Sequence, residues 1–438
     1  MRLRFPHPFV LLLSGVLVAA VLTWILPAGE YERRTDPATG RAVVVAGTYQ
    51  VVGASPVGPA QAVLAVPRGI VDGAEIIITI LLVGGAYALL ERTGALGRLV
   101  AALVGRSRYP VVVIAGVSAV FATFGALEGM HEEIIALVPV LLVLSGGLGF
   151  GAVTALAMSV GAAVVGAAFG PTNPFASGIA MQYAELPLLT EPALRVSMLL
   201  GATAVWFGWT MWQARHDDIH LDLGTLSGEP VRYRDGLLLA LVVLPFGPYV
   251  YGVLRLDWGF NELSALFLVA GFAVGLIAGF GLRGTAVEFL KGMETMLAAG
   301  LFVGVARAIS VVLTDGRIID TIVHNLSQPL HHVPGYLAAA LMVPVQAALH
   351  VAVPSTSGQA VLTMPIMVPV AELLEIPSLS AVIAYQTGML MDMLTPTNGA
   401  LLAMLLTAGV PYARWLRFAI PGALLVSVVG FAGLALAF

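Results

Sequence analysis

The chain of 438 residues has no cysteine, which excludes disulfide bonds, thiol chemistry and cysteine-ligated metal sites. It is also poor in charge, because Asp, Glu, Lys and Arg make up only 11% of its residues, against roughly 25% in a soluble domain. No basic run favours a nucleic-acid partner. We expect neither catalytic residues nor a cofactor. The nearest motif, His-Glu-Glu at 131–133, lacks the second histidine of a zinc-protease helix, because position 135 is Ile135.

What the sequence has instead is apolar surface. Hydrophobic residues make up 59% of the chain, and the mean hydropathy is +0.95. Apolar stretches recur from end to end, for example at 9–26, 237–253 and 263–281. A helix crossing the bilayer needs about 20 such residues. The sequence therefore predicts an all-α, multi-pass membrane protein surrounded by lipid.

The first apolar stretch follows Arg2 and Arg4, as the core of a signal peptide would. Its length is more than the roughly 7–15 residues of such a core, and no small-residue cleavage site follows. We interpret it as a retained first transmembrane helix with its N-terminus inside. The positions of Arg and Lys in later connections place the C-terminus outside. The expected location is a bacterial-type cytoplasmic membrane.

Four local features interrupt the apolar stretches. Glu-Gly-Met-His-Glu-Glu at 128–133 divides one stretch, and Pro-Ser-Thr-Ser-Gly at 354–358 divides another. Both are predicted to be tips of re-entrant helical hairpins, whose irregular backbone is tolerated only where protein or water surrounds it. Pro-Thr-Asn occurs at 171–173 and again at 396–398. Because proline ends a helix, each copy predicts a broken transmembrane helix.

The interruptions occur in the same order in the two halves of the chain, together with weaker matches such as Pro139 with Pro365. The positions of Arg predict that the first hairpin enters and leaves the membrane from the inside and the second from the outside. The two repeats would therefore have inverted topology. Inverted repeats with discontinuous helices are common in secondary transporters. The predicted organisation is a first transmembrane helix and outside loop (1–68), repeat 1 (69–214, hairpin about 110–146, broken helix about 150–184), a cytoplasmic linker (215–235), scaffold helices (236–282) and repeat 2 (283–438, hairpin about 336–374, broken helix about 378–408).

Three further segments carry a family resemblance: LTWILPAGEYER from position 22, AGTYQVV from position 46, and PTNPFASGIAMQYAELPL from position 171. With them the chain resembles the C4-dicarboxylate anaerobic carrier (DcuC-like) family of the ion transporter superfamily, and within it the YfcC branch. The resemblance implies an elevator-type transporter. In that mechanism a scaffold domain forms a homodimer, and a transport domain that holds both hairpins and both broken helices slides across the membrane. The superfamily usually carries Ser-Asn-Thr at its hairpin tips, which the second tip approaches and the first does not.

The polar residues at these interruptions are the candidate site. A charge at bilayer depth costs about 2.5–3.5 kcal/mol on insertion scales, so the acids of the first tip belong either to a surface loop or to an aqueous site for a cation, proton or ammonium group. The Thr and Asn of each break act as helix caps, as ligands, or as both. The second tip caps a helix N-terminus that suits a carboxylate. The candidate substrate- and ion-binding residues, which sodium would share, are Glu128, Gly129, His131, Glu132, Glu133, Pro171, Thr172, Asn173, Ser355, Thr356, Ser357, Asp392, Pro396, Thr397 and Asn398.

The roles of Asp392 and His350 are open between two interpretations each, whereas one role is expected for Arg195. Asp392 either binds an ion or is the structural partner of a hydroxyl group. His350 is either a proton relay or a structural histidine. Arg195 begins a helix and is expected to snorkel to the membrane interface.

The charges of the candidate site bear on the substrate. The inferred site holds up to four carboxylates, from Glu128, Glu132, Glu133 and Asp392, and no Lys or Arg. A dianionic substrate would need several compensating cations there, whereas a zwitterion or cation would not. The sequence therefore predicts a secondary active transporter of a small organic solute, coupled to protons or sodium. An amino acid, peptide or other amine-bearing carboxylate is favoured. A C4-dicarboxylate carrier and a sodium/proton antiporter are the alternatives.

Overall fold

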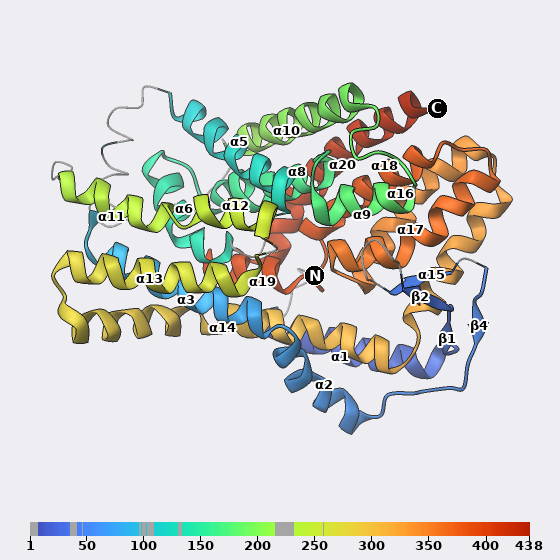
Figure 1. The fold of residues 1–438 in the computed structure, drawn as a ribbon, viewed down its shortest axis with the longest axis horizontal. Coiled ribbons are helices and arrows are strands. Elements are labelled where there is room, and N and C mark those ends of the chain that lie inside the picture. The colour runs from blue at the N-terminus through green and yellow to red at the C-terminus, as the bar shows by residue number, and fades with distance from the viewer. Residues whose placement is uncertain are drawn as a thin grey trace, which may run out of the picture.

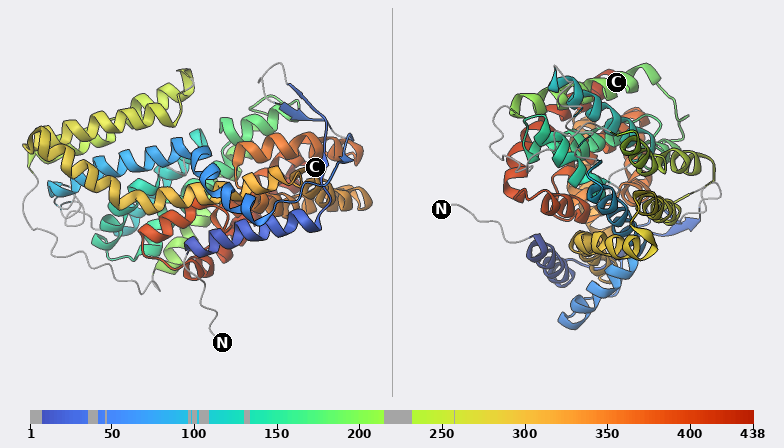
Figure 2. Two further views of the ribbon diagram at one scale, coloured as in Figure 1. Left: turned by 90° about the horizontal axis from the view of Figure 1, so that it is seen from below. Right: turned by 90° about the vertical axis from the view of Figure 1, so that its left-hand side faces the viewer.

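The computed structural model describes residues 8–35, 42–45, 47–95, 98, 102, 109–129, 134–214, 232–256 and 258–438. In these residues the protein is almost entirely helical, and its longest helices run roughly along the long axis of the molecule (Figure 1, Figure 2). The described part contains 7 helices that are long and apolar enough to cross a bilayer. The chain is therefore a multi-pass membrane protein.

The N-terminal helix α1 (Pro8–Ile25) is followed by two short antiparallel strand pairs. Strand β1 (Gly29–Glu30) pairs with β4 (Gln50–Val51), and β2 (Arg33–Thr35) pairs with β3 (Ala42–Val44). This loop is tied to α15 (Ile319–Ser327), which η3 (Gln328–His332) follows. Asp320 of α15 accepts hydrogen bonds from the Tyr31 backbone N–H at 2.9 Å and from the Arg33 guanidinium at 2.8 Å.

Helices α2 (Pro59–Asp72) and α3 (Ala74–Arg92) pack antiparallel against the 35-residue helix α14 (Gly281–Asp315). Two ion pairs connect these helices to α14: Arg68 of α2 pairs with Asp315, and Arg92 of α3 pairs with Glu288. Small residues let the backbones approach: a Cβ added at Gly69 would lie 2.5 Å from backbone atoms of α14. Close approach through glycine is a usual way of joining helices in a membrane.

Two helix pairs are each joined by a short tip. The first pair is α5 (Pro110–Glu128) and α6 (Ile134–Gly147), and the second is α16 (Gly335–Ala352) and α17 (Thr356–Leu373). Helix α5 ends at Gly129, whose φ of 67° is in the left-handed region that favours glycine. Helices α5 and α16 are also among those long enough to cross a bilayer alone.

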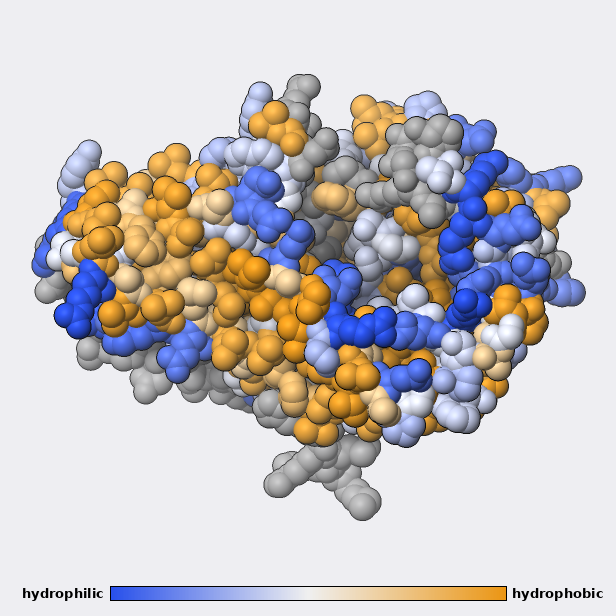
Figure 3. All heavy atoms as spheres, turned by 60° about the horizontal axis from the view of Figure 1, so that its bottom comes forward, coloured by the Kyte–Doolittle hydropathy of each residue, from blue (hydrophilic) through white to orange (hydrophobic). Residues whose placement is uncertain are grey.

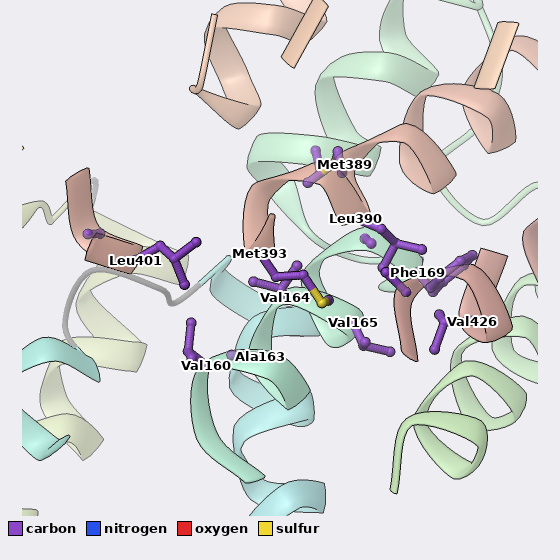
Figure 4. Close-up of a cluster of buried hydrophobic side chains, with 14 of the residues drawn as sticks. Val160, Ala163, Val164, Val165, Phe169, Met389, Leu390, Met393, Leu401 and Val426 are labelled. Atoms are coloured by element: carbon purple, nitrogen blue, oxygen red, sulfur yellow. The ribbon is translucent and has the colours of Figure 1, made fainter. Parts of the chain in front are cut away.

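Two helices are interrupted at Pro-Thr-Asn. In the first half, α7 (Ala152–Leu156), η1 (Ala157–Gly161) and α8 (Ala162–Phe169) form one run, which stops before η2 (Pro174–Gly178) and α9 (Ile179–Tyr183). In the second half, α18 (Ser378–Gly388) and η4 (Met389–Met393) stop before α19 (Gly399–Thr407). The long helices α10 (Pro192–Ala214) and α20 (Tyr412–Ala437) follow these segments. Figure 4 shows apolar side chains of α8, including Val164 and Phe169, gathered with Leu390 and Met393 of η4 in the core.

Helices α11 (Tyr233–Val243), α12 (Phe246–Leu256) and α13 (Phe260–Ala278) lie between the two halves of the chain. The sequence predicted one helix over 237–253, and this was wrong. The chain turns at Leu244 and Pro245, because proline lacks the N–H of a helix interior. Residues of α3, α11, α13 and α14 form an apolar cluster of their own. Large apolar side chains of α13 and α14, such as Val269 and Leu290, are exposed. Figure 3 shows that hydrophobic residues cover a broad part of one face of the molecule.

Glycine contacts position the first helix pair against the first interrupted helix. A Cβ at Gly125 of α5 would lie 2.0 Å from the Ala163 carbonyl oxygen, and one at Gly116 of the same helix would meet nothing within 4 Å. We predict that Gly125→Val lowers the stability of the protein by about 1–3 kcal/mol or more, because backbone cannot give way as a side chain can. Thermal unfolding in detergent measures the change. Gly116→Val is the matched control, and equal effects of the two variants would contradict this packing.

Candidate functional site

A cavity of about 380 Å³ lies where the interrupted elements converge. Its wall includes both tips, the segments that follow both breaks, the middle of α14 and the connection between α12 and α13. Of the residues predicted from the sequence, Gly129, Ser355, Thr356, Ser357, Asp392, Thr397 and Asn398 line it. The structure thus brings together positions 129 and 398, which are far apart in the chain.

Asn173 caps the helical segment that follows the first break but does not line the cavity. Its side chain is buried, and its oxygen accepts hydrogen bonds from the backbone N–H groups of Phe175 at 2.9 Å and Ala176 at 3.0 Å. Its amide nitrogen donates to the Gly125 carbonyl of α5 at 3.1 Å. Pro171 is buried and Thr172 is exposed, and neither lines the cavity, which Phe175 reaches instead.

Asn398 closes the second break and does face the cavity. Its oxygen caps α19 by accepting from the Leu401 backbone N–H at 3.0 Å. Its amide nitrogen donates to Asp392 Oδ1 at 2.8 Å. The Thr397 hydroxyl donates to the Val351 carbonyl at the end of α16, at 2.9 Å. Pro396 makes the interruption but is not part of the wall. The second break is therefore hydrogen-bonded to α16 of the second helix pair.

Asp392 joins a buried polar chain behind the cavity wall. His350 Nε2 lies 2.9 Å from Asp392 Oδ1, and His350 Nδ1 lies 2.6 Å from the Gln359 side-chain oxygen. Gln359 in turn donates to the backbone carbonyl of Gln346 at 2.8 Å. His350, Gln346 and Gln359 are fully buried, whereas Asp392 reaches the cavity. The side-chain partners of Asp392 are thus an imidazole and an amide rather than the expected hydroxyl group. Asp392 also reaches the cavity, so its role in binding an ion stays a prediction.

The second tip forms the N-terminus of α17. The Ser355 hydroxyl accepts from the Gly358 backbone N–H at 3.3 Å, which makes Ser355 the cap of this helix. The Tyr385 hydroxyl donates to the Thr356 carbonyl at 2.7 Å and holds the tip against α18. Because a helix N-terminus carries partial positive charge, this part of the wall favours an anionic group.

The acids of the first tip fall largely outside the described part of the chain. His131, Glu132 and Glu133 are not among the described residues, and Glu128 is described only as the last residue of α5. Gly129, directly before them, lines the cavity. The role of these acids therefore stays a prediction.

Arg307 of α14 also lines the cavity, so the expectation that the site contains no Arg was wrong. Its side chain is 39% exposed, and its Nη1 lies 3.5 Å from Asp72 Oδ2. The sequence did hold the signal. Arg307 stands alone in a long apolar run, and an ionisable residue there is by default a functional candidate. The cavity therefore combines a cation with the carboxylate of Asp392.

Arg195 was also placed wrongly at the membrane interface. It is only 2% exposed. Its guanidinium donates to the carbonyls of Leu188 and Pro171 and, at 2.7 Å, to the Ser177 hydroxyl. Ser177 also accepts from Gln386 of α18 at 2.9 Å. Arg195 therefore satisfies one carbonyl at the first break, that of Pro171, and one in the loop before α10, that of Leu188. Through Ser177 it also connects this region to the second half of the chain.

Sodium fits poorly at the described polar groups beside Asp392. A sodium ion needs several oxygen ligands that are free to turn toward it. Asp392 Oδ1 already faces the Asn398 amide nitrogen and His350 Nε2, and the Asn398 oxygen is committed to Leu401. Asp392 Oδ1 thus faces two nitrogen atoms rather than the oxygen atoms that a sodium ion needs.

The family model of the C4-dicarboxylate anaerobic carriers (DcuC) matches residues 5–438. The chain belongs to the C4-dicarboxylate anaerobic carrier family. This carrier is accordingly a membrane transporter and not an enzyme. The family resemblance seen in the sequence is thereby confirmed.

Two relatives of the carrier cover most of its length. An "Uncharacterized protein" of Haemophilus influenzae is 26% identical and covers 95% of this chain and 94% of its own. The "Putative basic amino acid antiporter YfcC" of Escherichia coli is 27% identical and covers 78% of this chain and 73% of its own.

Two solved transporter structures are more distantly similar to the carrier. The YdaH transporter of Alcanivorax borkumensis has 15% identity and a TM-score of 0.45, with 98% of each chain covered. MtrF of Neisseria gonorrhoeae, from a class of antimetabolite efflux pumps, has 14% identity and a TM-score of 0.43, covering 99% of this chain and 95% of its own. At such TM-scores neither similarity defines the fold or the mechanism of this carrier.

Arg195 provides a test of how the first break is held. We predict that Arg195→Leu destabilises the carrier by about 3 kcal/mol or more, because buried carbonyls and Ser177 lose a charged donor. Arg195→Lys should recover only part of this, since an ammonium cannot reproduce the guanidinium geometry. Thermal unfolding in detergent reports both variants. Arg417→Lys, at an exposed position of α20, is the control. Parent-like stability of Arg195→Leu would refute this role.

Proposed function

We propose that this carrier is a secondary active transporter of an amino acid, taken up or exchanged across the cytoplasmic membrane. The observation that carries the proposal is that Arg307 and Asp392 line one cavity. An amino acid presents a carboxylate and an ammonium group, and a site with one group of each sign complements both. The cavity volume of about 380 Å³ is within the range of small-molecule sites.

The two ends of the solute would be bound by different elements. Arg307 of α14 would bind the carboxylate, since a guanidinium matches a carboxylate in two parallel hydrogen bonds. The N-terminus of α17 at Ser355 lies in the same wall and adds positive potential. Asp392 would receive the ammonium group. This revises the charge argument from the sequence but keeps its preference for an amine-bearing carboxylate.

A basic amino acid is the first candidate within this class. One relative bears the name of a basic amino acid antiporter. Glu128, Glu132 and Glu133 of the first tip would supply negative charge for a second cationic group, and the adjoining Gly129 lines the cavity.

The C4-dicarboxylate alternative uses the same residues differently. Arg307 and the N-terminus of α17 would bind the two carboxylates, and Asp392 would have to be protonated because like charges repel in a confined site. The family to which the chain belongs supports this alternative. A sodium/proton antiporter gives Arg307 no solute carboxylate to bind and is less well supported.

For the mechanism, we propose an elevator built from inverted repeats. Helix α14 occupies the place in the second half that α2 and α3 occupy in the first, and each half continues with a helix pair, an interrupted helix and a long helix. Residues of α3, α12, α13 and α14 line the cavity together with residues of both tips and of the segments around both breaks. Helices α3, α12, α13 and α14 would be the scaffold of a homodimer, and the helix pairs would be re-entrant hairpins that move with the solute. The N-terminus would be inside and the C-terminus outside.

Arg307 gives the direct test of solute recognition. We predict that the purified parent binds L-arginine, and that Arg307→Gln weakens this binding about 10- to 100-fold, because a charge-assisted hydrogen bond is lost. Agmatine, which lacks the carboxylate, should bind weakly to the parent and be little affected by the substitution. Isothermal titration calorimetry measures these affinities, with succinate as the dicarboxylate probe.

The matched control is Arg68→Gln, which removes an arginine that pairs with Asp315 outside the cavity. It should bind L-arginine like the parent. Tight binding of succinate but not of L-arginine would establish the dicarboxylate alternative. Unchanged affinity in Arg307→Gln for both probes would show that this residue does not bind the solute.

A further inference from the structure

His350 is held in one hydrogen-bonding state by its surroundings. The Gln359 amide nitrogen faces the backbone carbonyl oxygen of Gln346, which can only accept a hydrogen bond, so the Gln359 oxygen is the atom that faces His350. An amide oxygen is also only an acceptor. His350 Nδ1 must therefore carry a hydrogen and donate it over the 2.6 Å to Gln359.

The other side of the imidazole then needs one more proton. His350 Nε2 and Asp392 Oδ1 are 2.9 Å apart, and with no proton between them a nitrogen lone pair would face a carboxylate oxygen. Asn398 cannot relieve this, because its orientation is fixed by the Leu401 backbone N–H and its amide nitrogen also donates to Oδ1. One proton between these atoms, on Nε2 or on the carboxyl group, would satisfy both of them at the 2.9 Å separation.

The remaining charged and titratable groups around the pair can be named from the described residues. Arg307 of α14 lines the cavity that Asp392 reaches. The Tyr385 hydroxyl of α18 donates to the Thr356 carbonyl of the second tip. Tyr412 of α20 donates to the Leu394 carbonyl at 2.5 Å. The Asp320 and His324 side chains of α15 are bonded to the N-terminal loop. The Glu372 side chain of α17 accepts from the Ser378 hydroxyl.

We propose that His350 and Asp392 form the binding site of the coupling proton, and that the solute's ammonium group and this proton compete for Asp392. The inference rests on the proposed function. Only Asp392 reaches the cavity, so it is the route by which the proton leaves and the point at which an ammonium group arrives. When the ammonium group binds, it replaces the proton's charge beside the carboxylate. The proton passes to cavity water, and His350 stays neutral with its hydrogen on Nδ1.

Such competition makes the carrier an exchanger of solute against protons. Binding of either one lowers the affinity for the other, by thermodynamic reciprocity. The pair also joins α16 to η4, and the Thr397 hydroxyl joins the end of α16 to the same break. Loss of the proton removes one of these two connections. Proton release would thereby be linked to the position of the second tip.

The experiment measures protons and solute separately. Isothermal titration calorimetry of the purified parent with L-arginine, repeated in buffers of different ionisation enthalpy, gives the number of protons released per solute bound. We expect release of up to one proton, and an affinity that weakens by up to about tenfold per pH unit as the pH falls. In His350→Gln the proton release should be lost and the affinity should become nearly independent of pH. His332→Gln, an exposed histidine on η3, is the control and should behave like the parent.

A second variant should shift the pH of half-maximal proton release, which misfolding would not do. Gln359→Met keeps a similar volume but removes the acceptor of the Nδ1 hydrogen, so the pair should hold its proton less tightly. The pH at which proton release is half-maximal should therefore move down. A potentiometric difference titration of the parent against His350→Gln/Asp392→Asn tests the proton site without any solute. One bound proton fewer per chain is expected in the double variant over the pH range in which the parent's solute binding releases a proton.

The outcomes separate the two proposals. If the parent binds L-arginine without releasing a proton, or if His350→Gln keeps the parent's release and pH dependence, the proton site is refuted while the amino-acid site stands. If the parent binds no L-arginine but the difference titration shows the missing proton, the solute assignment fails and the proton site is supported. No difference in the titration overturns the proton site whatever the solute.

Discussion

A helix that is interrupted among apolar neighbours must find partners for the backbone groups that the interruption frees, because no bulk water is available to them. The rest of this structure depends on that constraint. Asn173 and Asn398 supply acceptors for the freed N–H groups. Carbonyl groups are satisfied by Arg195 at the first break and by the indole of Trp415, which donates to Met393 at 2.7 Å, at the second.

The same constraint explains why polar residues gather at one place. Once Asn398 is needed to cap α19, its amide group has a donor to spare, and Asp392 accepts it. Asp392 is in turn a hydrogen-bond partner of His350, and His350 is a partner of Gln359. Each of these polar groups thus provides a hydrogen-bond partner for the previous one. The chain of contacts ends at a cavity, where Asp392 and Arg307 face a space large enough for a solute.

Much of this organisation can be predicted from the sequence, because its strongest signals are local. Proline and asparagine in an apolar run predict an interrupted helix, and Ser355 before a helical run predicts a cap. What the sequence does not contain is the direction in which a side chain points. Pro171, Thr172 and Pro396 belong to the breaks but not to the cavity wall, and Arg195 is buried because of contacts with residues 171, 177 and 188. The charge of Arg307 marks it in the sequence, but which face of α14 meets the cavity depends on how the neighbouring helices pack.

The central claim is that Arg307 and Asp392 bind the two ends of one solute. A cryo-electron microscopy structure of the carrier in lipid nanodiscs, with L-arginine at saturating concentration, tests this most directly. We predict density in the cavity that connects Arg307 to Asp392, with the carboxylate at the guanidinium and the ammonium group at the carboxylate. Solute density elsewhere in the protein, in contact with neither residue, would contradict the account.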